Sequence, residues 1–315
     1  MAKILTDTQK ERFKRLETAL TEACAIGELD SAKAFAKDIR ALAKSTDQNS
    51  RWLLNLNKLC EASINYGDYN FAIQHLHSVI ATSNQQTRLR IEAHALLAVA
   101  YIRTKNLDYS KEHISKAIEN IKNIRSRNRR KIFYEKLVMR MEEEAILFGS
   151  VLNDHPVLDI DEIQNKAIEL VKTKAETELL AIIGTNLPSL SIQFFNEVRN
   201  STLLQIPHVE RLQLPPPNAT ISFAAIGKKA VGALKLVCWR ALCDENDDLY
   251  KGWVQNVDIF YSKKVLSAAV GSILIEYKIG STLFAAALVA YLFRIGCKVF
   301  CKTFAPVGIM VRHKK

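Results

Sequence analysis

The chain has 315 residues, 48% of them apolar, and this length favours two domains with a sizeable core over one small domain. A formal net charge of +11 favours an anionic partner, either nucleic acid or an acidic membrane surface. The six cysteines are scattered, and the start of the chain lacks the apolar stretch of a secretory signal. We therefore expect no disulfide framework and a cytoplasmic, reducing location.

Three segments near the start of the chain align with one another as helical hairpins. In each, a first helix ends at a turn, where Gly27 and Gly67 suit a left-handed cap. A small residue then lets the second helix pack closely on the first. The aligned positions are Leu20, Ala23, Gly27 to Asp30, Ala32 and Ile39 in the first segment, Leu59, Cys60, Ser63, Gly67 to Tyr69, Ala72 and Val79 in the second, and Leu97 to Tyr101, Lys105 to Ser110, Ile114 and Ala117 in the third.

This spacing resembles the tetratricopeptide repeat (TPR), although the segments recur at about forty residues, more than that repeat's usual period. The resemblance implies a stack of hairpins that docks another protein on its concave face. The alternative is an antiparallel helical bundle with alanine-rich contacts, so either interpretation is all-α. On the concave face we expect Asn65, Tyr66, His94, Tyr101 and Arg103.

A long helix is predicted after Ile121, and we expect it to cap the stack at about residue 150. Its apolar positions, Ile132, Phe133, Leu137, Met141 and Ile146, recur at helical spacing. The same helix carries a basic run that suits the phosphates of a structured RNA or DNA. The alternative is a solvated face balanced by neighbouring acids. The basic run is Lys122, Arg125, Arg127, Arg129, Arg130, Lys131, Lys136 and Arg140.

Connecting helices are expected over residues 151–214, followed by a proline-rich hinge over 215–218. An amphipathic helix after Pro156 has Asp159 and Asp161 near its N-terminus, where acidic groups are favourable. Gly184 to Pro188 ends that helix, and Leu190 to Val198 forms a shorter one. The buried face of the amphipathic helix is expected to contain Ile160, Ile163, Ala167, Leu170 and Val171.

The remaining residues, 219–315, are predicted to form a basic, apolar helical bundle. Their uncharged runs, Val265 to Ile275 and Ile279 to Phe293, are shorter than the roughly twenty apolar residues that span a bilayer. They are therefore either the central helices of a soluble bundle, or a hairpin that inserts into a membrane or joins copies of the chain. The residues expected to make membrane or oligomer contacts are Leu274, Ile275, Leu283, Phe284, Leu288 and Leu292.

Three C-terminal stretches, beginning at Ala233, Ser262 and Val299, resemble small uncharacterised bacterial modules from accessory or anti-phage gene clusters. The resemblance implies an effector part fused to a repeat sensor, and it brings no catalytic residues. Our leading hypothesis is therefore a bacterial defence protein that docks a partner and acts at membranes once activated. The alternatives are a nucleic-acid-binding accessory subunit and a soluble assembly scaffold.

Metal binding is not expected. The cysteine pairs Cys238/Cys243 and Cys297/Cys301 fall in apolar helical stretches, which favours buried free thiols over a zinc site. The acidic cluster at 244–248 lacks the turn glycine of a calcium loop and is expected to cap a helix over 250–257.

Enzymatic activity is not expected either, because the nucleotide and general-base motifs are incomplete. Gly227, followed by two lysines, lacks the preceding glycine of a phosphate-binding loop. Four histidines in the repeats suit groove lining or core packing better than general-base chemistry, namely His75, His77, His94 and His113. We therefore assign no catalytic residue, metal ligand or cofactor.

Overall fold

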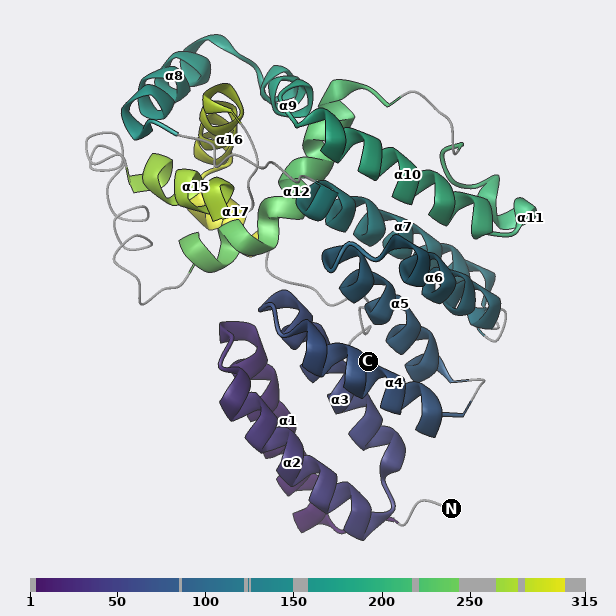
Figure 1. Cartoon of the computed structure of the whole chain (residues 1–315). Coiled ribbons are helices and arrows are strands. Elements are labelled where there is room, and N and C mark those ends of the chain that lie inside the picture. Colours follow the sequence, from purple (N-terminus) through teal and green to yellow (C-terminus); the bar gives the residue numbers. More distant parts are fainter. Residues whose placement is uncertain are drawn as a thin grey trace. The chain divides into compact units, whose positions relative to one another are not determined.

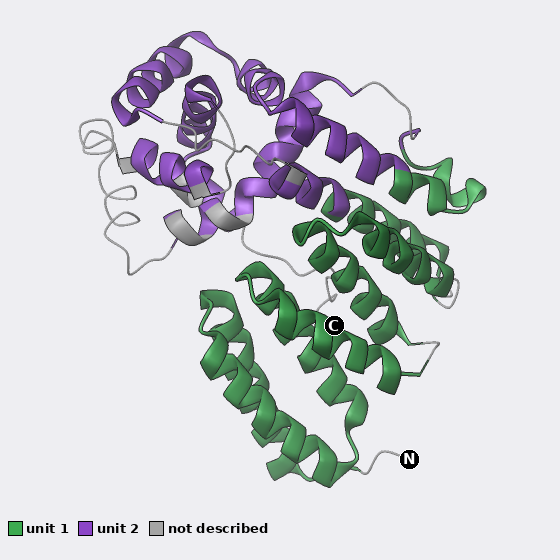
Figure 2. Ribbon diagram, viewed as in Figure 1, with its two compact units in different colours: residues 1–140, 201–214, 307–315 green, residues 141–200, 215–306 purple. Residues whose placement is uncertain are grey.

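The computed structural model describes residues 4–84, 87–121, 124, 126–149, 158–216, 221–243, 265–276 and 281–303. Every regular element within these residues is a helix, so the all-α prediction is confirmed (Figure 1). The chain divides into two compact units (Figure 2). Unit 1 contains residues 1–140, 201–214 and 307–315, and unit 2 contains residues 141–200 and 215–306.

Unit 1 begins with six helices that pack in chain order. Each of them contacts the next, and α3 also contacts α1 and α5, so successive hairpins touch through their first helices. This is a stack of helical hairpins, and its assignment to the tetratricopeptide family stays a prediction. The helices are α1 (Asp7–Ile26), α2 (Leu29–Thr46), α3 (Asn49–Asn65), α4 (Tyr69–Thr82), α5 (Arg88–Arg103) and α6 (Leu107–Ile121).

The turns and close contacts of this stack follow from local sequence. Thr6 and Gln9 form a capping box at the start of α1. Gly27 and Gly67 adopt φ values of 84° and 87°, which confirms that both take the left-handed conformation after the first helix of a hairpin. The small residues predicted to allow close helix packing are fully buried; they are Ala32, Ala72 and Ser110.

Three further helices involve unit 1, and two of them continue into unit 2. The long helix α7 (Arg127–Gly149) begins five residues later than the sequence suggests, and α6 ends at Ile121. Helix α10 (Ser189–Gln205) is longer than predicted, since its apolar stripe continues through buried Leu203. The short α11 (His208–Arg211) follows it.

Unit 2 contains the expected connecting helices. The side chain of Asp159 caps α8 by accepting a hydrogen bond from the backbone of Asp161, at 2.8 Å. One helix was expected to run as far as Gly184, but the chain turns at Lys174 and a new helix starts beyond Ala175. The Glu178 carboxylate accepts from the Ala175 amide at 2.9 Å and caps that new start. The two helices are α8 (Ile160–Thr173) and α9 (Glu176–Thr185).

The C-terminal helices pack directly on these connecting helices. Helix α16 contacts α8, α9 and α15, and α12 contacts α9. The two units change between Leu214 and Pro215, where the sequence suggests a boundary. Unit 2 also takes the connecting helices, because the apolar faces of α8 and α9 are buried against the C-terminal helices. Those helices are α12 (Phe223–Leu242), α15 (Val265–Glu276), α16 (Thr282–Ile295) and α17 (Cys297–Thr303).

Several sequence predictions fall outside the described residues. They concern Lys122, Arg125, the acidic cluster at 244–248, the helix expected over 250–257 and the end of the hinge, residues 217–218.

Candidate docking surface and histidine pocket

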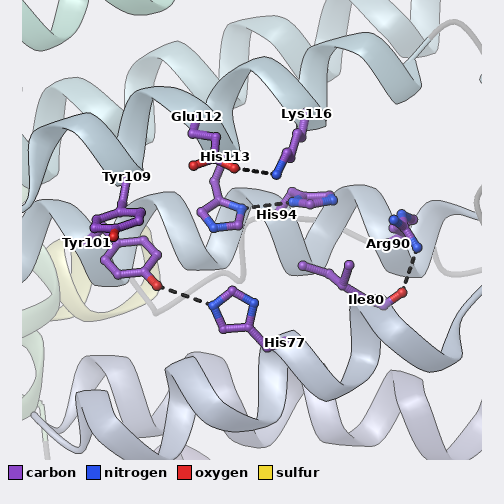
Figure 3. A pocket seen from close by; sticks show the side chains of 9 residues that line it. All are labelled: His77, Ile80, Arg90, His94, Tyr101, Tyr109, Glu112, His113 and Lys116. Atoms are coloured by element: carbon purple, nitrogen blue, oxygen red, sulfur yellow. Dashed lines mark hydrogen bonds and ion pairs between the residues drawn. The ribbon is translucent and has the colours of Figure 1, made fainter.

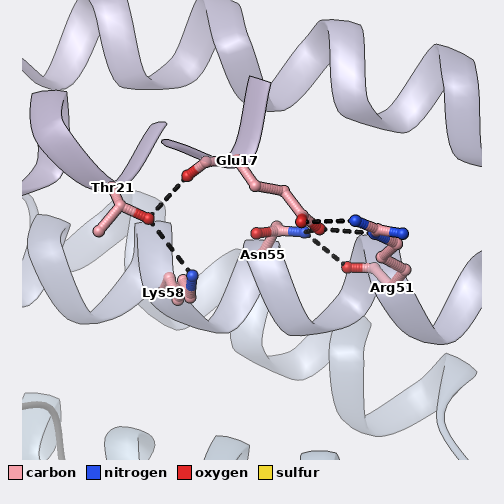
Figure 4. A network of polar contacts seen from close by, with 5 residues as sticks. All are labelled: Glu17, Thr21, Arg51, Asn55 and Lys58. Atoms are coloured by element: carbon pink, nitrogen blue, oxygen red, sulfur yellow. Dashed lines mark hydrogen bonds and ion pairs between the residues drawn. The ribbon is translucent and has the colours of Figure 1, made fainter. Parts of the chain in front are cut away.

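A polar network joins the first helices of the first two hairpins (Figure 4). Glu17 on α1 accepts two hydrogen bonds from the Arg51 guanidinium on α3, each at 2.7 Å. The Asn55 amide donates to the same carboxylate at 2.8 Å, and Lys58 donates to the Thr21 hydroxyl at 3.3 Å. Arg51, Asn55 and Lys58 are spaced so that one face of α3 presents all three.

The Glu17 carboxylate stays ionised in this setting. Burial alone raises the pKa of Glu17, but the hydrogen bonds from Arg51 and Asn55 outweigh it and hold that pKa below its ordinary value. The hydrogen bond to Glu17 raises the pKa of Arg51 in turn. The Arg51 guanidinium also lies 4.3 Å from the ring centre of Phe13, so its position is fixed on both sides.

The same kind of contact continues from α3 to α5 and α7. Arg103 donates to the Ile64 carbonyl at 2.6 Å and to the Asn65 side chain at 3.3 Å. Arg140 on α7 donates to the same Asn65 oxygen at 3.1 Å. On α5, Arg88 pairs with Glu92 at 2.9 Å. Burial and the nearby charge of Arg88 lower the pKa of Lys136 on α7, so Lys136 lies close to Arg88. We call the following set the polar band: Glu17, Arg51, Asn55, Lys58, Asn65, Arg88, Glu92, Arg103, Lys136 and Arg140.

The five residues expected on one concave face are divided among three places. Asn65 and Arg103 belong to the polar band. Tyr66 packs against the turn after α1, where its hydroxyl donates to the Ala25 carbonyl at 2.8 Å. His94 and Tyr101 lie on the opposite side of α5 from Arg103. Each residue of a helix turns the chain by about 100°, so Arg103 is about two and a half turns beyond His94 and about half a turn beyond Tyr101.

His94 and Tyr101 instead line a pocket between α4, α5 and α6 (Figure 3). Its volume is about 340 Å³. The pocket combines imidazole, phenol, guanidinium and ammonium groups with one carboxylate. The lining residues are His77, Ile80, Arg90, His94, Tyr101, Tyr109, Glu112, His113 and Lys116.

Two buried imidazoles face each other in this pocket. His94 and His113 are 3% and 4% exposed, and their Nδ1 atoms are 2.9 Å apart. One ring must donate and the other accept, so the two rings hold different protonation or tautomeric forms. His77 makes a similar contact through Nε2 with the Tyr101 hydroxyl, at 3.2 Å.

Aromatic stacking, an ion pair and a hydrogen bond to the backbone hold the other side chains that line the pocket. Tyr101 stacks on Tyr109 with ring centres 5.3 Å apart, and on its other neighbour, His113, at 5.5 Å. Lys116 forms an ion pair with Glu112 on the same helix. Arg90 donates to the Ile80 carbonyl at 2.6 Å, which fixes its guanidinium at the rim.

Burial keeps both imidazoles neutral. Burial is the largest cause that lowers the pKa of His94, to about 3, and the charges of His113, Arg90 and Lys116 lower it further. Burial likewise lowers the pKa of His113 to about 4, followed by the charges of His77 and Lys116. The pocket therefore offers neutral donors and acceptors beside two cations. Neither buried histidine is set up as a cation at neutral pH.

Among the described residues of the basic run predicted for nucleic acid, two pair with acidic side chains. Arg130 pairs with Glu210 at 2.9 Å and donates to the Ile124 carbonyl at 2.8 Å. Lys131 lies 3.9 Å from Glu135. Arg127 and Arg129 are exposed at the start of α7. Contact of these two side chains with the phosphates of a nucleic acid stays a prediction.

The residues expected to contact a membrane or a second copy are mostly buried within unit 2. Leu274, Phe284, Leu288 and Leu292 are at most 1% exposed, whereas Ile275 is 38% exposed and Leu283 is half-buried. Membrane contact would need these side chains to leave the contacts of α16 with α8 and α9, and it stays a prediction. No helix among the described residues is both long enough and apolar enough to cross a bilayer.

The cysteines correct one prediction. Cys243 and Cys301 form a disulfide, whereas free thiols were expected at both positions. The pairing arises because α12 and α17 contact each other, which spacing along the chain does not reveal. Cys238 is buried and free, as expected. Across the described part of the chain, no group of three or more His, Cys, Asp or Glu side chains is arranged to hold a metal ion.

Sequence reasoning missed most of the polar band and the partners of His94. A same-face spacing of polar residues on α3 was visible at positions 51, 55 and 58, but their partners on α1 are more than thirty residues away. No protein-family model, curated protein or solved structure matches the chain. The site must therefore be interpreted from its own geometry.

Proposed function

We propose that unit 1 is a protein-docking module and that its polar band binds an acidic segment of the partner. The observation that carries this proposal is the charge of the band, in which six residues are basic and two are acidic. Arg51 and Arg88 keep 30% and 48% of their side-chain surface exposed, so both remain accessible to a partner. A tetratricopeptide-like role in protein interaction agrees with this arrangement.

Most side chains of the band are fixed by hydrogen bonds, which favours specific binding of one partner over non-specific electrostatic attraction. Arg51 and Arg140 are each fixed by hydrogen bonds to a neighbouring helix, and the buried Arg103 holds the end of α3 in place. Fixed donors lose less side-chain entropy on binding than mobile lysines do. Carboxylates of a protein segment match such donors, and guanidinium–carboxylate pairs add geometric specificity.

Site-specific photo-crosslinking in the native cell tests this proposal. A photo-reactive amino acid would replace Lys58 or Arg88 in the band and, as a control, the exposed Lys37 on α2. We expect both band positions, but not Lys37, to crosslink to the same protein. Replacing Arg88 and Lys136 by Gln should weaken the purified complex by about tenfold, whereas Lys14→Gln with Lys37→Gln should not.

Crosslinked products that disappear on nuclease treatment would contradict protein docking and favour the nucleic-acid alternative. Equal crosslinking from Lys37 would also count against the band as the docking surface. The membrane, phage-defence and scaffold hypotheses stay predictions, and the crosslinked partner's identity would show which of them to pursue.

A further inference from the structure

The histidine pocket is separate from the proposed docking surface. It opens between α4, α5 and α6, and its α5 residues lie opposite Arg88 and Arg103 around the helix. The polar band therefore does not account for the pocket, whose role needs its own explanation. Its volume of about 340 Å³ lies in the range that holds small organic ligands.

The charges that face the buried imidazoles are mainly positive. Helix α4 contributes His77, α5 contributes Arg90, and α6 contributes Glu112 and Lys116. Glu112 is already paired with Lys116. With the imidazoles neutral, the lining carries one more positive charge than negative. An anion would relieve the repulsion among these groups, whereas a second cation would increase it.

We propose that this pocket binds a small organic anion that carries an aromatic ring. The ring packs along the wall formed by Tyr101 and Tyr109, whose own rings are stacked. The anionic group, whether carboxylate, sulfonate or phosphate, lies near Lys116 and accepts a hydrogen bond from it, while Arg90, three helical turns from Tyr101 along α5, adds positive charge at the far end of the pocket. A small inorganic anion such as sulfate would leave most of the 340 Å³ unfilled. We therefore expect the ligand to have an organic part as well as the anionic group.

Binding of such an anion is coupled to proton uptake. Burial and the nearby cations keep His113 and His94 neutral in the empty pocket, with pKa values of about 4 and about 3. A bound anion stabilises an imidazolium, so it raises the pKa of at least one ring toward the ordinary value near 6.5. Affinity for an anion of constant charge therefore rises as the pH falls from about 7.5 to about 5.5.

Benzenesulfonate tests the proposal on the full-length protein, because its charge is constant over this pH range. We expect saturable binding in calorimetry, tighter at the lower pH, together with shifts of the imidazole signals of His94 and His113 in nuclear magnetic resonance spectra. Sulfate, which lacks the ring, and benzyl alcohol, which lacks the charge, should both bind more weakly. Benzyl alcohol binding as tightly as benzenesulfonate would overturn the proposal.

Two substitutions locate the anionic group. Lys116→Gln should weaken benzenesulfonate binding by about tenfold, the usual effect of removing a charged hydrogen bond. Arg90→Gln should weaken it less, because Arg90 acts only through its charge at a distance. The matched control Lys37→Gln on α2 should leave it unchanged. Because Arg90 also donates to the Ile80 carbonyl, Lys116→Gln is the decisive variant. Unchanged affinity in folded Lys116→Gln protein would place the anion elsewhere and refute the assignment.

The third substitution tests proton coupling. His113→Asn keeps a donor near the position of Nδ1, next to His94, but removes the titration of ring 113. We expect the affinity for benzenesulfonate to become less dependent on pH in this variant. A pH dependence identical to that of the native protein in both His113→Asn and His94→Asn would contradict the coupling.

Discussion

Glu142 on α7 is a buried carboxylate of unit 2 with two basic partners. It is 2% exposed, pairs with Arg199 at 3.0 Å and also contacts Lys229. Removing one partner of a buried ion pair leaves an uncompensated buried charge. We expect Glu142→Ala to lower the free energy of unfolding by about 3–5 kcal/mol, measured by urea denaturation followed by circular dichroism.

A double variant separates lost packing from the buried charge. Replacing Glu142 and Arg199 together by leucine removes both charges and keeps apolar volume in the core. This variant should recover much of the stability that Glu142→Ala loses, since the desolvation cost of the pair disappears with it. If the double variant were as unstable as the single one, an uncompensated buried charge would not explain the effect.

Glu17 predicts a pH-dependent contribution to the stability of unit 1. Its pKa in the folded protein is below the ordinary value of 4.5, so the contribution is present above that value and fades as the pH falls through the lowered pKa. We expect Glu17→Gln to cost about 1–2 kcal/mol at pH 7 and much less once the pH falls below the lowered pKa. Unfolding curves at several pH values would measure the difference, and a cost independent of pH would contradict it.

Residues that act on their immediate neighbours were predictable, and residues with distant partners were not. Gly27 and Gly67 follow apolar helical stretches, so their left-handed conformation could be expected from sequence. Asp159 could be placed near a helix start from sequence as well, because acidic groups are favourable there. The contact between His94 and His113 joins two helices, and no local pattern at either position indicates the partner.

At the scale of helices, the crossing of α9 and α12 depends on two glycines. An added Cβ at Gly184 would overlap the Phe223 carbonyl oxygen, and one at Gly227 would overlap the Leu180 carbonyl oxygen. Alanine normally stabilises a helix relative to glycine by about 1 kcal/mol. Here we expect Gly184→Ala and Gly227→Ala each to destabilise unit 2 by about 1–3 kcal/mol, because the two backbones must move apart.

Gly271 on α15 is the matched control for this crossing. The nearest atom to an added Cβ there is the terminal Cδ1 of Ile160, which belongs to a side chain that can change its rotamer. Gly271→Ala should therefore be close to neutral or slightly stabilising in thermal unfolding. Equal destabilisation by Gly271→Ala and Gly184→Ala would show that the α9–α12 backbone contact has no special effect.

The existence of a helix was easier to predict than its ends and faces. The repeating apolar positions of α7 and α8 are enough to identify both as helices from sequence. The end of α8 was missed, because the capping of Ala175 by Glu178 starts a new helix within an otherwise periodic stretch. The two polar faces of α5 were missed as well, since every residue from Ile91 to Ala100 is buried and gives no amphipathic pattern.

At the scale of the whole molecule, segments distant in sequence complete each unit. Unit 1 takes residues 201–214 in addition to its first 140, and unit 2 joins 141–200 to 215–306. A boundary drawn at the prolines follows the one composition signal available in that region. It misses the exchange of segments, because which helices bury each other's apolar faces depends on contacts and not on linker composition.

The disulfide between Cys243 and Cys301 allows the independence of the two units to be tested. It joins positions 58 residues apart within unit 2, so it restricts the unfolded chain of that unit alone. We expect Cys243→Ser, or a reductant, to lower the stability of unit 2 by about 2–4 kcal/mol. Hydrogen exchange followed by mass spectrometry should then show faster exchange in α12 and α16, with α1 to α5 unchanged.

The reductant should have no further effect on the Cys243→Ser variant, which controls for the free thiols of Cys24, Cys60 and Cys238. Equal acceleration of exchange in α1 to α5 would mean that the two units unfold together. No change in either unit would mean that the bond contributes nothing to stability. Since reducing compartments disfavour such bonds, the expected cytoplasmic location predicts that the chain works in the less stable, reduced form of unit 2. That form is therefore the one in which contacts of α16 with a membrane or a second copy should be sought.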